Sequence, residues 1–209
     1  MEDKATFYAY LTIHDFFDCF VFDAVIRDTN TIIRLCAGNK IWKKEQPGDV
    51  VFHMEKLAEL CSAAFVIHDG FSQREEVIIN APPGEPPDIY KTKWYFDGAF
   101  STSLWDNIPR NLSAGQYYNP YKAIKKFCNY MPEAQWKKTL ETLVMYALYS
   151  DSVLDISPHY NLFTMRLRLL QLIEACHLIN VRTTNKEKKE DLQKTKNQKT
   201  PAKGKKIKK

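Results

Sequence analysis

The segment SPHYNLFTMRLRLLQLIEACHLINV, residues 157–181, decides the fold class of this chain. Ser157 and Pro158 form a helix start signal, because proline is favoured in the first turn of a helix. Beyond them, apolar residues cover most of the helical circumference. Only a thin polar stripe interrupts them: Asn161, Thr164, Arg168, Gln171 and Glu174. A helix that is apolar almost all round must be buried among other elements. We therefore predict that this segment is the central helix of a bundle.

Two long helices are predicted in the N-terminal part of the chain. Residues 4–37 carry a polar stripe with a period of about 3.6 residues, which indicates one helix, bent near residues 28–31. The stripe consists of Thr12, Asp15, Cys19, Asp23, Arg27, Asn30 and Arg34. Asp49 is suited to cap a second helix that ends at Asp69, where Gly70 allows the left-handed stop.

Two further helices are predicted between this region and the central helix. Asn119 and Pro120 are an N-cap and first-turn pair for a short helix, and Pro132 opens another helix that extends to about Tyr149. Residues 71–118 lack helical periodicity and contain a proline-rich connector, so we expect a loop-rich insertion with room for one small β-hairpin. The fold prediction is mainly α, a single bundle of about five helices.

The C-terminal residues differ in composition from the rest of the chain. Residues 183–209 hold 11 of the 30 Lys and Arg residues and three of the 25 acidic residues, so their net charge is +8 and that of residues 1–182 is −3. Residues 183–209 also contain few apolar residues, and these bury too little surface to offset the conformational entropy that the segment would lose on folding. We therefore predict a helical domain over residues 1–182 and a lysine-rich, disordered tail over residues 183–209. The alternative is that the last helix extends partway into residues 187–196 of this tail.

The overall composition excludes several classes of protein. The chain has 209 residues, of which 44% are hydrophobic and 26% charged, with only seven glycines, which excludes a collagen-like or wholly disordered protein. The apolar runs are interrupted by Asp15, Asp18 and Asp23, so we expect no membrane span. The N-terminal residues lack the pattern of a signal peptide. We expect a cytoplasmic protein.

The five cysteines are odd in number and widely spaced, and none forms a Cys-x-x-Cys pair. This spacing does not supply the ligand set of a structural zinc site, and it does not define a disulfide framework. We predict that they are buried free thiols: Cys19, Cys36, Cys61, Cys128 and Cys176.

One candidate catalytic segment is AAFVIHDG, around His68 and Asp69, which resembles the His-Asp segment of HD-type metal-dependent phosphohydrolases. A divalent metal held by such a pair turns its bound water into a nucleophile at neutral pH. The resemblance implies a metal site of His68, Asp69 and His14, completed by a further acid such as Asp97 or Asp106. The competing interpretation is a packed His68 with Asp69 at the helix end and no metal.

Glu174 and His177 have the i, i+3 spacing of carboxylate and imidazole ligands in ferritin-like di-iron bundles. Such sites need the motif twice, and the chain has one copy. We therefore expect an exposed Glu174 beside a His177 at the edge of the core. No glycine-rich phosphate loop and no nucleophile elbow is found, and we expect no cofactor and, on balance, no enzyme.

Two features of the sequence are typical of nucleic-acid-binding proteins. Lysines at the end of the chain can neutralise phosphates without reading sequence; the densest group is Lys203, Lys205, Lys206, Lys208 and Lys209. In the alternating run of residues 90–96, Trp94 and Tyr95 fall on opposite faces of a strand, and such aromatics can stack on single-stranded bases. A half-buried strand explains the same run without a ligand.

Our leading functional hypothesis is a non-enzymatic interaction or accessory protein. Its helical body would dock a protein partner or self-associate, and its tail would add non-specific attraction to nucleic acid or another anionic surface. The alternatives are an HD-like phosphohydrolase and a single-stranded nucleic-acid-binding protein.

Overall fold

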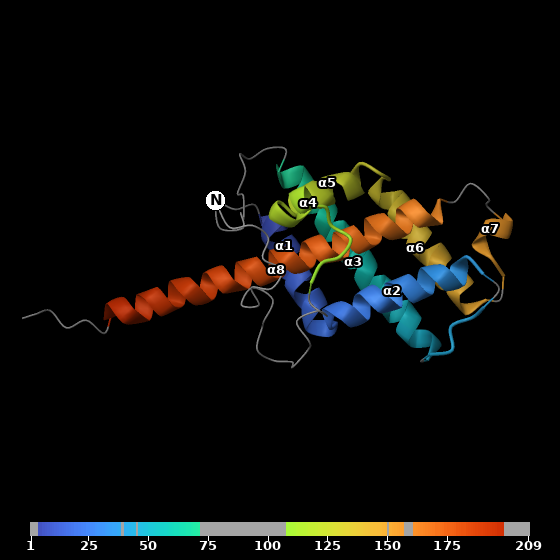
Figure 1. Cartoon of the computed structure of the whole chain (residues 1–209), viewed down its shortest axis with the longest axis horizontal. Helices are drawn as coiled ribbons and strands as arrows, with labels where there is room; N and C mark the ends of the chain where they lie inside the picture. Colours follow the sequence, from blue (N-terminus) through green and yellow to red (C-terminus); the bar gives the residue numbers. More distant parts are fainter. Residues whose placement is uncertain are drawn as a thin grey trace, which may run out of the picture.

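The computed structural model describes residues 4–38, 40–44, 46–71, 108–149, 151–156 and 161–198 (Figure 1). In these ranges the chain is mainly helical, as predicted, and contains no strand. The helices are α1 Lys4–Cys19, α2 Phe22–Cys36, α3 Pro47–Phe71, α4 Ala114–Tyr118, α5 Tyr121–Cys128, α6 Glu133–Leu148, α7 Val153–Ile156 and α8 Leu162–Gln198.

The first part of α8 forms the centre of the molecule. Every residue from Leu169 to Ile179 is buried, the polar ones included. Helices α1, α2, α4 and α5 pack against α8, and α3 packs against α1, α5 and α6. A fully buried Leu or Ile side chain contributes about 1.5–3 kcal/mol, so the apolar residues of this run contribute substantially to the stability of the fold. The prediction of a central helix is confirmed.

The N-terminal helix is broken rather than bent. The prediction of one helix over residues 4–37 is wrong, because α1 ends at Cys19 and Val21 has an extended conformation with φ −70° and ψ 131°. The break lies upstream of the bend predicted near residues 28–31. Its reason is tertiary packing: the break lets Phe17 of α1 and Phe22 of α2 both contact His177, with ring centroids 5.2 Å and 4.0 Å away.

The helix start signals are partly correct. α3 spans Pro47–Phe71, close to the predicted residues 49–69, but the predicted cap and stop are wrong: Asp49 lies inside the helix, where its Oδ2 accepts from the Gln46 N–H at 2.8 Å, and Gly70 is helical. The side chain of Asn119 likewise does not cap α5, whose N-cap residue is Pro120. The sequence signal that was missed is the Ser-x-x-Gln box of α4. The Gln116 backbone N–H donates to Ser113 Oγ at 3.4 Å, and the Ser113 N–H donates to Gln116 Oε1 at 2.9 Å.

The last helix starts later and ends later than predicted. α8 begins at Leu162, where the Thr164 N–H donates to Asn161 Oδ1 at 3.0 Å, and it continues through Gln198. Figure 1 shows the C-terminal part of α8 extending beyond the other helices. Residues 184–198 therefore continue the helix slightly further than the extension predicted into residues 187–196, because Lys, Glu and Gln are good helix formers and can propagate an existing helix. Residues 72–107 and 199–209 lie outside the described part.

Candidate functional site

The densest polar arrangement in the described part of the chain surrounds Glu174 on α8. Its carboxylate is only 1% exposed, in contrast to the exposed position that we predicted. Oε1 accepts hydrogen bonds from the Arg110 N–H at 2.8 Å and from Asn111 Nδ2 at 2.7 Å. Oε2 accepts from the N–H groups of Asn111 at 2.8 Å and Leu112 at 3.1 Å. Two donors on each oxygen satisfy the carboxylate.

The electrostatics of Glu174 combine two opposing effects. Burial raises the pKa of Glu174 above its usual range, while the four hydrogen bonds from residues 110–112 act in the opposite direction. A buried carboxylate is tolerated where every acceptor site is filled, and this one is. Because its oxygens are occupied, Glu174 acts as a clamp on residues 110–112 in this structure.

Neighbouring side chains of α8 extend the clamp in both directions. Gln171 Nε2 donates to the Asn111 carbonyl at 3.0 Å, and Arg168 Nη1 donates to Gln171 Oε1 at 2.9 Å. Further along, Arg182 donates to the carbonyls of Tyr117 at 2.7 Å and Tyr118 at 3.3 Å, at the C-terminal end of α4. Residues 110–118 are therefore held on α8 along most of their length.

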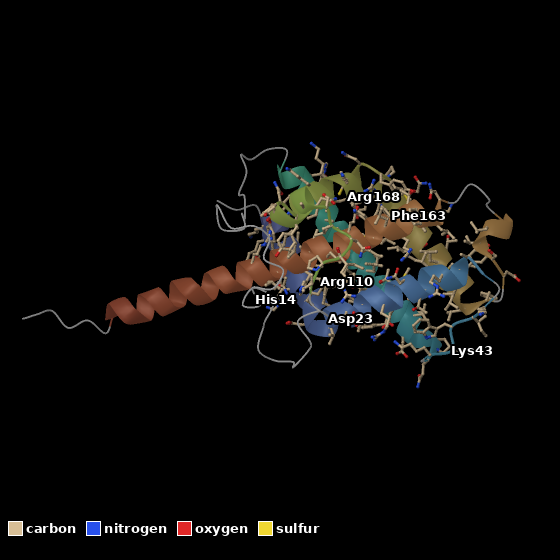
Figure 2. The ribbon with its side chains drawn as sticks, viewed as in Figure 1. His14, Asp23, Lys43, Arg110, Phe163 and Arg168 are labelled. Atoms are coloured by element: carbon tan, nitrogen blue, oxygen red, sulfur yellow. The ribbon has the colours of Figure 1, made fainter. Side chains whose placement is uncertain are left out.

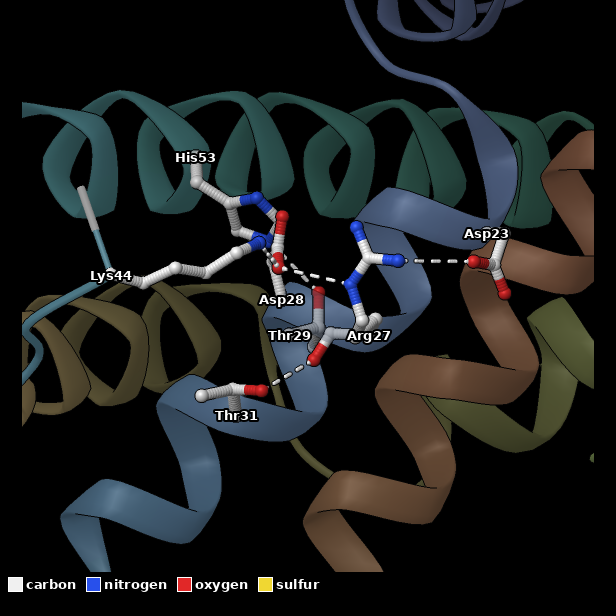
Figure 3. Close-up of polar contacts among 7 residues, drawn as sticks. All are labelled: Asp23, Arg27, Asp28, Thr29, Thr31, Lys44 and His53. Carbon is white, nitrogen blue, oxygen red and sulfur yellow. Dashed lines mark hydrogen bonds and ion pairs between the residues drawn. The ribbon is translucent and has the colours of Figure 1, made fainter.

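A second buried polar pair joins α2 to α3 (Figure 3). Thr29 Oγ1 and His53 Nε2 lie 2.8 Å apart, the distance expected of a hydroxyl nucleophile and its base. Thr29 has no exposed surface and His53 is only 5% exposed. A substrate has no access to this hydroxyl, so the pair serves as a packed hydrogen bond between two helices.

Burial is the main cause of the protonation state of His53, and the charges beside it act in opposite directions. Burial lowers the pKa of His53 from 6.5 to about 4; Asp28 opposes this shift and Lys44 adds to it. Asp28 is held by Lys44, with Nζ to Oδ1 at 2.7 Å, and lies 3.8 Å from Arg27 Nε (Figure 3). His53 is consequently neutral at pH 7 and pairs with Thr29 as a neutral imidazole.

The structure separates two of the candidate metal ligands. His68 Nδ1 lies 3.2 Å from Asp69 Oδ1 at the end of α3, whereas His14 pairs with Asp18 at 3.4 Å on the exposed face of α1 (Figure 2). A Cβ atom on Gly70 would lie 3.1 Å from the Thr6 side chain, which fixes that end of α3 beside the start of α1. His14 is eight residues further along α1, a rise of about 12 Å from Thr6, and its imidazole pairs there with Asp18.

No group of three or more His, Cys, Asp and Glu side chains in the described ranges is arranged to hold a metal ion. Asp97 and Asp106, which would complete the set, lie outside those ranges. In the described part of the chain the HD-type resemblance is thus limited to the adjacent pair His68 and Asp69.

The nucleic-acid candidates fall outside the described residues. These are Trp94, Tyr95, Lys203, Lys205, Lys206, Lys208 and Lys209. In the bundle itself, the three lysines of α5, Lys122, Lys125 and Lys126, are exposed, and Tyr121 on the same helix is mostly buried. α5 therefore has a solvated basic face, without the Tyr121 ring available for stacking.

Four of the five cysteines are buried free thiols, as predicted, whereas Cys19 is exposed and the prediction for it is wrong. Burial raises the pKa of Cys36 and of Cys128 to about 12, and it also raises the pKa values of Cys61 and Cys176. A thiol with a raised pKa is a poor nucleophile at neutral pH, because the thiolate is the reactive form.

Comparisons with protein-family models, with curated proteins and with solved structures found no match to this chain. None of the helices in the described ranges is long and apolar enough to cross a membrane.

Proposed function

We propose that this protein is a non-enzymatic helical interaction protein that attaches to a polyanion, such as nucleic acid, through the lysine-rich C-terminal end of its chain. The bundle presents surfaces to a protein partner or to a second copy. The attachment is electrostatic and independent of base sequence.

The observation that carries this proposal is the course of α8. The helix is buried as far as Arg182, and then extends beyond the other helices (Figure 1). Residues 183–209, which follow that point, have a net charge of +8. Six of their eleven lysines lie in residues 199–209, where there is no acidic residue. A cationic segment carried away from a mildly acidic bundle avoids competition from its own carboxylates.

The two buried polar arrangements support the same conclusion from inside the bundle. The Glu174 clamp and the Thr29–His53 pair each satisfy their own hydrogen-bonding groups within the protein. Both act to fix helices and segments in place, which is what a rigid interaction scaffold needs.

The test compares two full-length variants that lose the same number of lysines. In the tail variant, Lys→Gln replaces Lys199, Lys203, Lys205, Lys206, Lys208 and Lys209. In the matched bundle variant, Lys→Gln replaces six exposed lysines: Lys40, Lys43, Lys122, Lys125, Lys126 and Lys138. Binding of each to fluorescent duplex and single-stranded DNA is measured by anisotropy at one fixed salt concentration.

We expect the tail variant to lose at least tenfold in affinity for both DNA forms, and the bundle variant to lose less than threefold. Equal losses in the two variants would contradict attachment through the C-terminal end. A loss confined to single-stranded DNA would favour the stacking alternative instead.

A further inference from the structure

The exposed surface formed by α1 and α3 combines apolar side chains with a negative charge. On α1, Tyr8 is 61% exposed and Leu11 is 41% exposed; on α3, Phe52 and Val66 are exposed. We call the surface of Tyr8, Leu11, Asp15, Phe52, Glu59 and Val66 the α1–α3 face.

Side-chain contacts place α1 and α3 side by side, with the exposed residues of the face on both helices. The two helices are antiparallel, because Thr6 lies beside Gly70 while Phe20 contacts Phe52, with ring centroids 5.8 Å apart. Lys56 of α3 lies between Glu59 and Phe52 of the same helix: its Nζ is 2.8 Å from the Glu59 carboxylate and 6.0 Å from the centre of the Phe52 ring. Its hydrogen bond to Glu59 raises the pKa of Lys56, and the Asp15 carboxylate contributes from across the helix pair.

The charge of this pair of helices is strongly one-sided. α1 and α3 together contain six acidic residues and two lysines, a net charge of −4, whereas residues 1–182 as a whole carry −3. Lys56, one of the two lysines, is paired with Glu59. His14, on the exposed side of α1, is paired with Asp18. Two of these six acidic residues, Asp15 and Glu59, belong to the α1–α3 face itself, so its exposed apolar side chains lie on a pair of helices with a net negative charge.

The complementary ligand is a cationic segment with an apolar residue among its charges. The chain contains one in residues 203–209, KGKKIKK, where Ile207 has two lysines on either side. Ile207 would contact the apolar side chains while Lys205, Lys206, Lys208 and Lys209 face the carboxylates. Exposed apolar patches rimmed by complementary charge are typical of protein interaction sites.

The length of the chain favours a second copy over binding within one molecule. From Arg182 to Gln198 α8 rises by about 24 Å away from the bundle. The five residue steps from Gln198 to Lys203 span at most about 16–18 Å when fully extended. This is less than the rise of the helix, so the whole segment of residues 203–209 cannot reach back to the bundle of its own molecule. The tail of a neighbouring copy has no such restriction.

We propose that the α1–α3 face binds the lysine-rich residues 203–209 of a second copy of this chain, so that the protein self-associates head to tail. A polyanion that takes up those lysines would release the contact. This inference goes beyond the polyanion attachment proposed above and stands independently of it.

The test uses a labelled peptide of residues 199–209 as ligand and the full-length tail variant defined above as receptor, so that the receptor's own lysines do not compete. Asp15→Asn with Glu59→Gln removes two charges from the face. Glu141→Gln with Asp151→Asn removes two exposed charges from α6 and the segment before α7, as the matched control. Peptide binding is measured by anisotropy without nucleic acid, and circular dichroism confirms that each receptor is folded.

We expect saturable binding that the face substitutions weaken at least fivefold and the control substitutions weaken less than twofold. Sedimentation of the unaltered protein should show association that rises with concentration and disappears in the tail variant. Absence of peptide binding, or equal weakening in both receptors, would overturn the proposal. Because this assay contains no DNA, its failure is distinguishable from failure of polyanion attachment.

Discussion

The two parts of α8 belong to one helix but are stabilised by different interactions. From Leu162 to Arg182 the helix is surrounded by other elements, and its polar side chains are used as clamps on residues 110–118. Beyond residue 183 the same helix extends away from the bundle (Figure 1). The first part is ordered by tertiary packing, and the second continues the same helix through residues that favour helix formation. One part fixes the fold, and the other extends from it.

The largest expected difference between the two parts is their response to proline. Ile173→Pro removes a backbone hydrogen bond and forces a clash in a segment with no exposed surface, so we expect no cooperative unfolding transition at all. Lys189→Pro makes the same change in the projecting part, where we expect the Tm to change by less than about 2 °C and only the helical signal to fall. Thermal unfolding followed by circular dichroism measures both. A large fall in Tm for Lys189→Pro would show that the second part is packed.

The second effect concerns the Glu174 clamp. Glu174→Ala leaves the N–H groups of residues 110–112 without their acceptor, and we expect a loss of about 4 kcal/mol in the free energy of unfolding. Glu174→Gln retains one acceptor oxygen and should lose about half as much. Glu141→Ala, an exposed glutamate on α6, serves as the control and should change stability by less than about 0.5 kcal/mol.

Urea unfolding gives these differences, and hydrogen exchange identifies their cause. In Glu174→Ala the amides of Asn111 and Leu112 should exchange faster than those of α3. Unchanged exchange at these two amides would mean that other contacts hold the segment.

The third expected effect is a pH-dependent change in the free energy of unfolding, of up to about 3 kcal/mol, that is caused by His53. The unfolded chain binds a proton on His53 below pH 6.5, while the folded chain does so only near pH 4. The unfolded state therefore gains more protons as the pH falls, and the His53 contribution is lost progressively between pH 6.5 and pH 4. His53→Gln keeps a hydrogen-bonding partner for Thr29 and should flatten this part of the stability profile. A variant that keeps the full slope would assign the effect to other groups.

Local patterns predicted most of the helices because their signals are contained in a few neighbouring residues. The apolar circumference of residues 162–181 and the approximate bounds of α3 are examples. The break at Phe20 and Val21 was not predictable in this way, since it depends on His177, which is far away in sequence and contacts Phe17 and Phe22 only in the fold. Glu174 was misjudged for the same reason: its donors, residues 110–112, are supplied by tertiary contact. The difference in net charge between residues 1–182 and residues 183–209 could be predicted from the sequence alone.

In the function that we propose, the C-terminal lysines, and not the bundle, bind a polyanion. The most direct test is the slope of log K against log salt concentration for the unaltered protein and a 20-base-pair DNA duplex. If the six lysines of residues 199–209 all neutralise phosphates, we expect a slope of about −5, and a slope near zero for the tail variant. A shallow slope for the unaltered protein, or a steep one that persists in the tail variant, would contradict the claim.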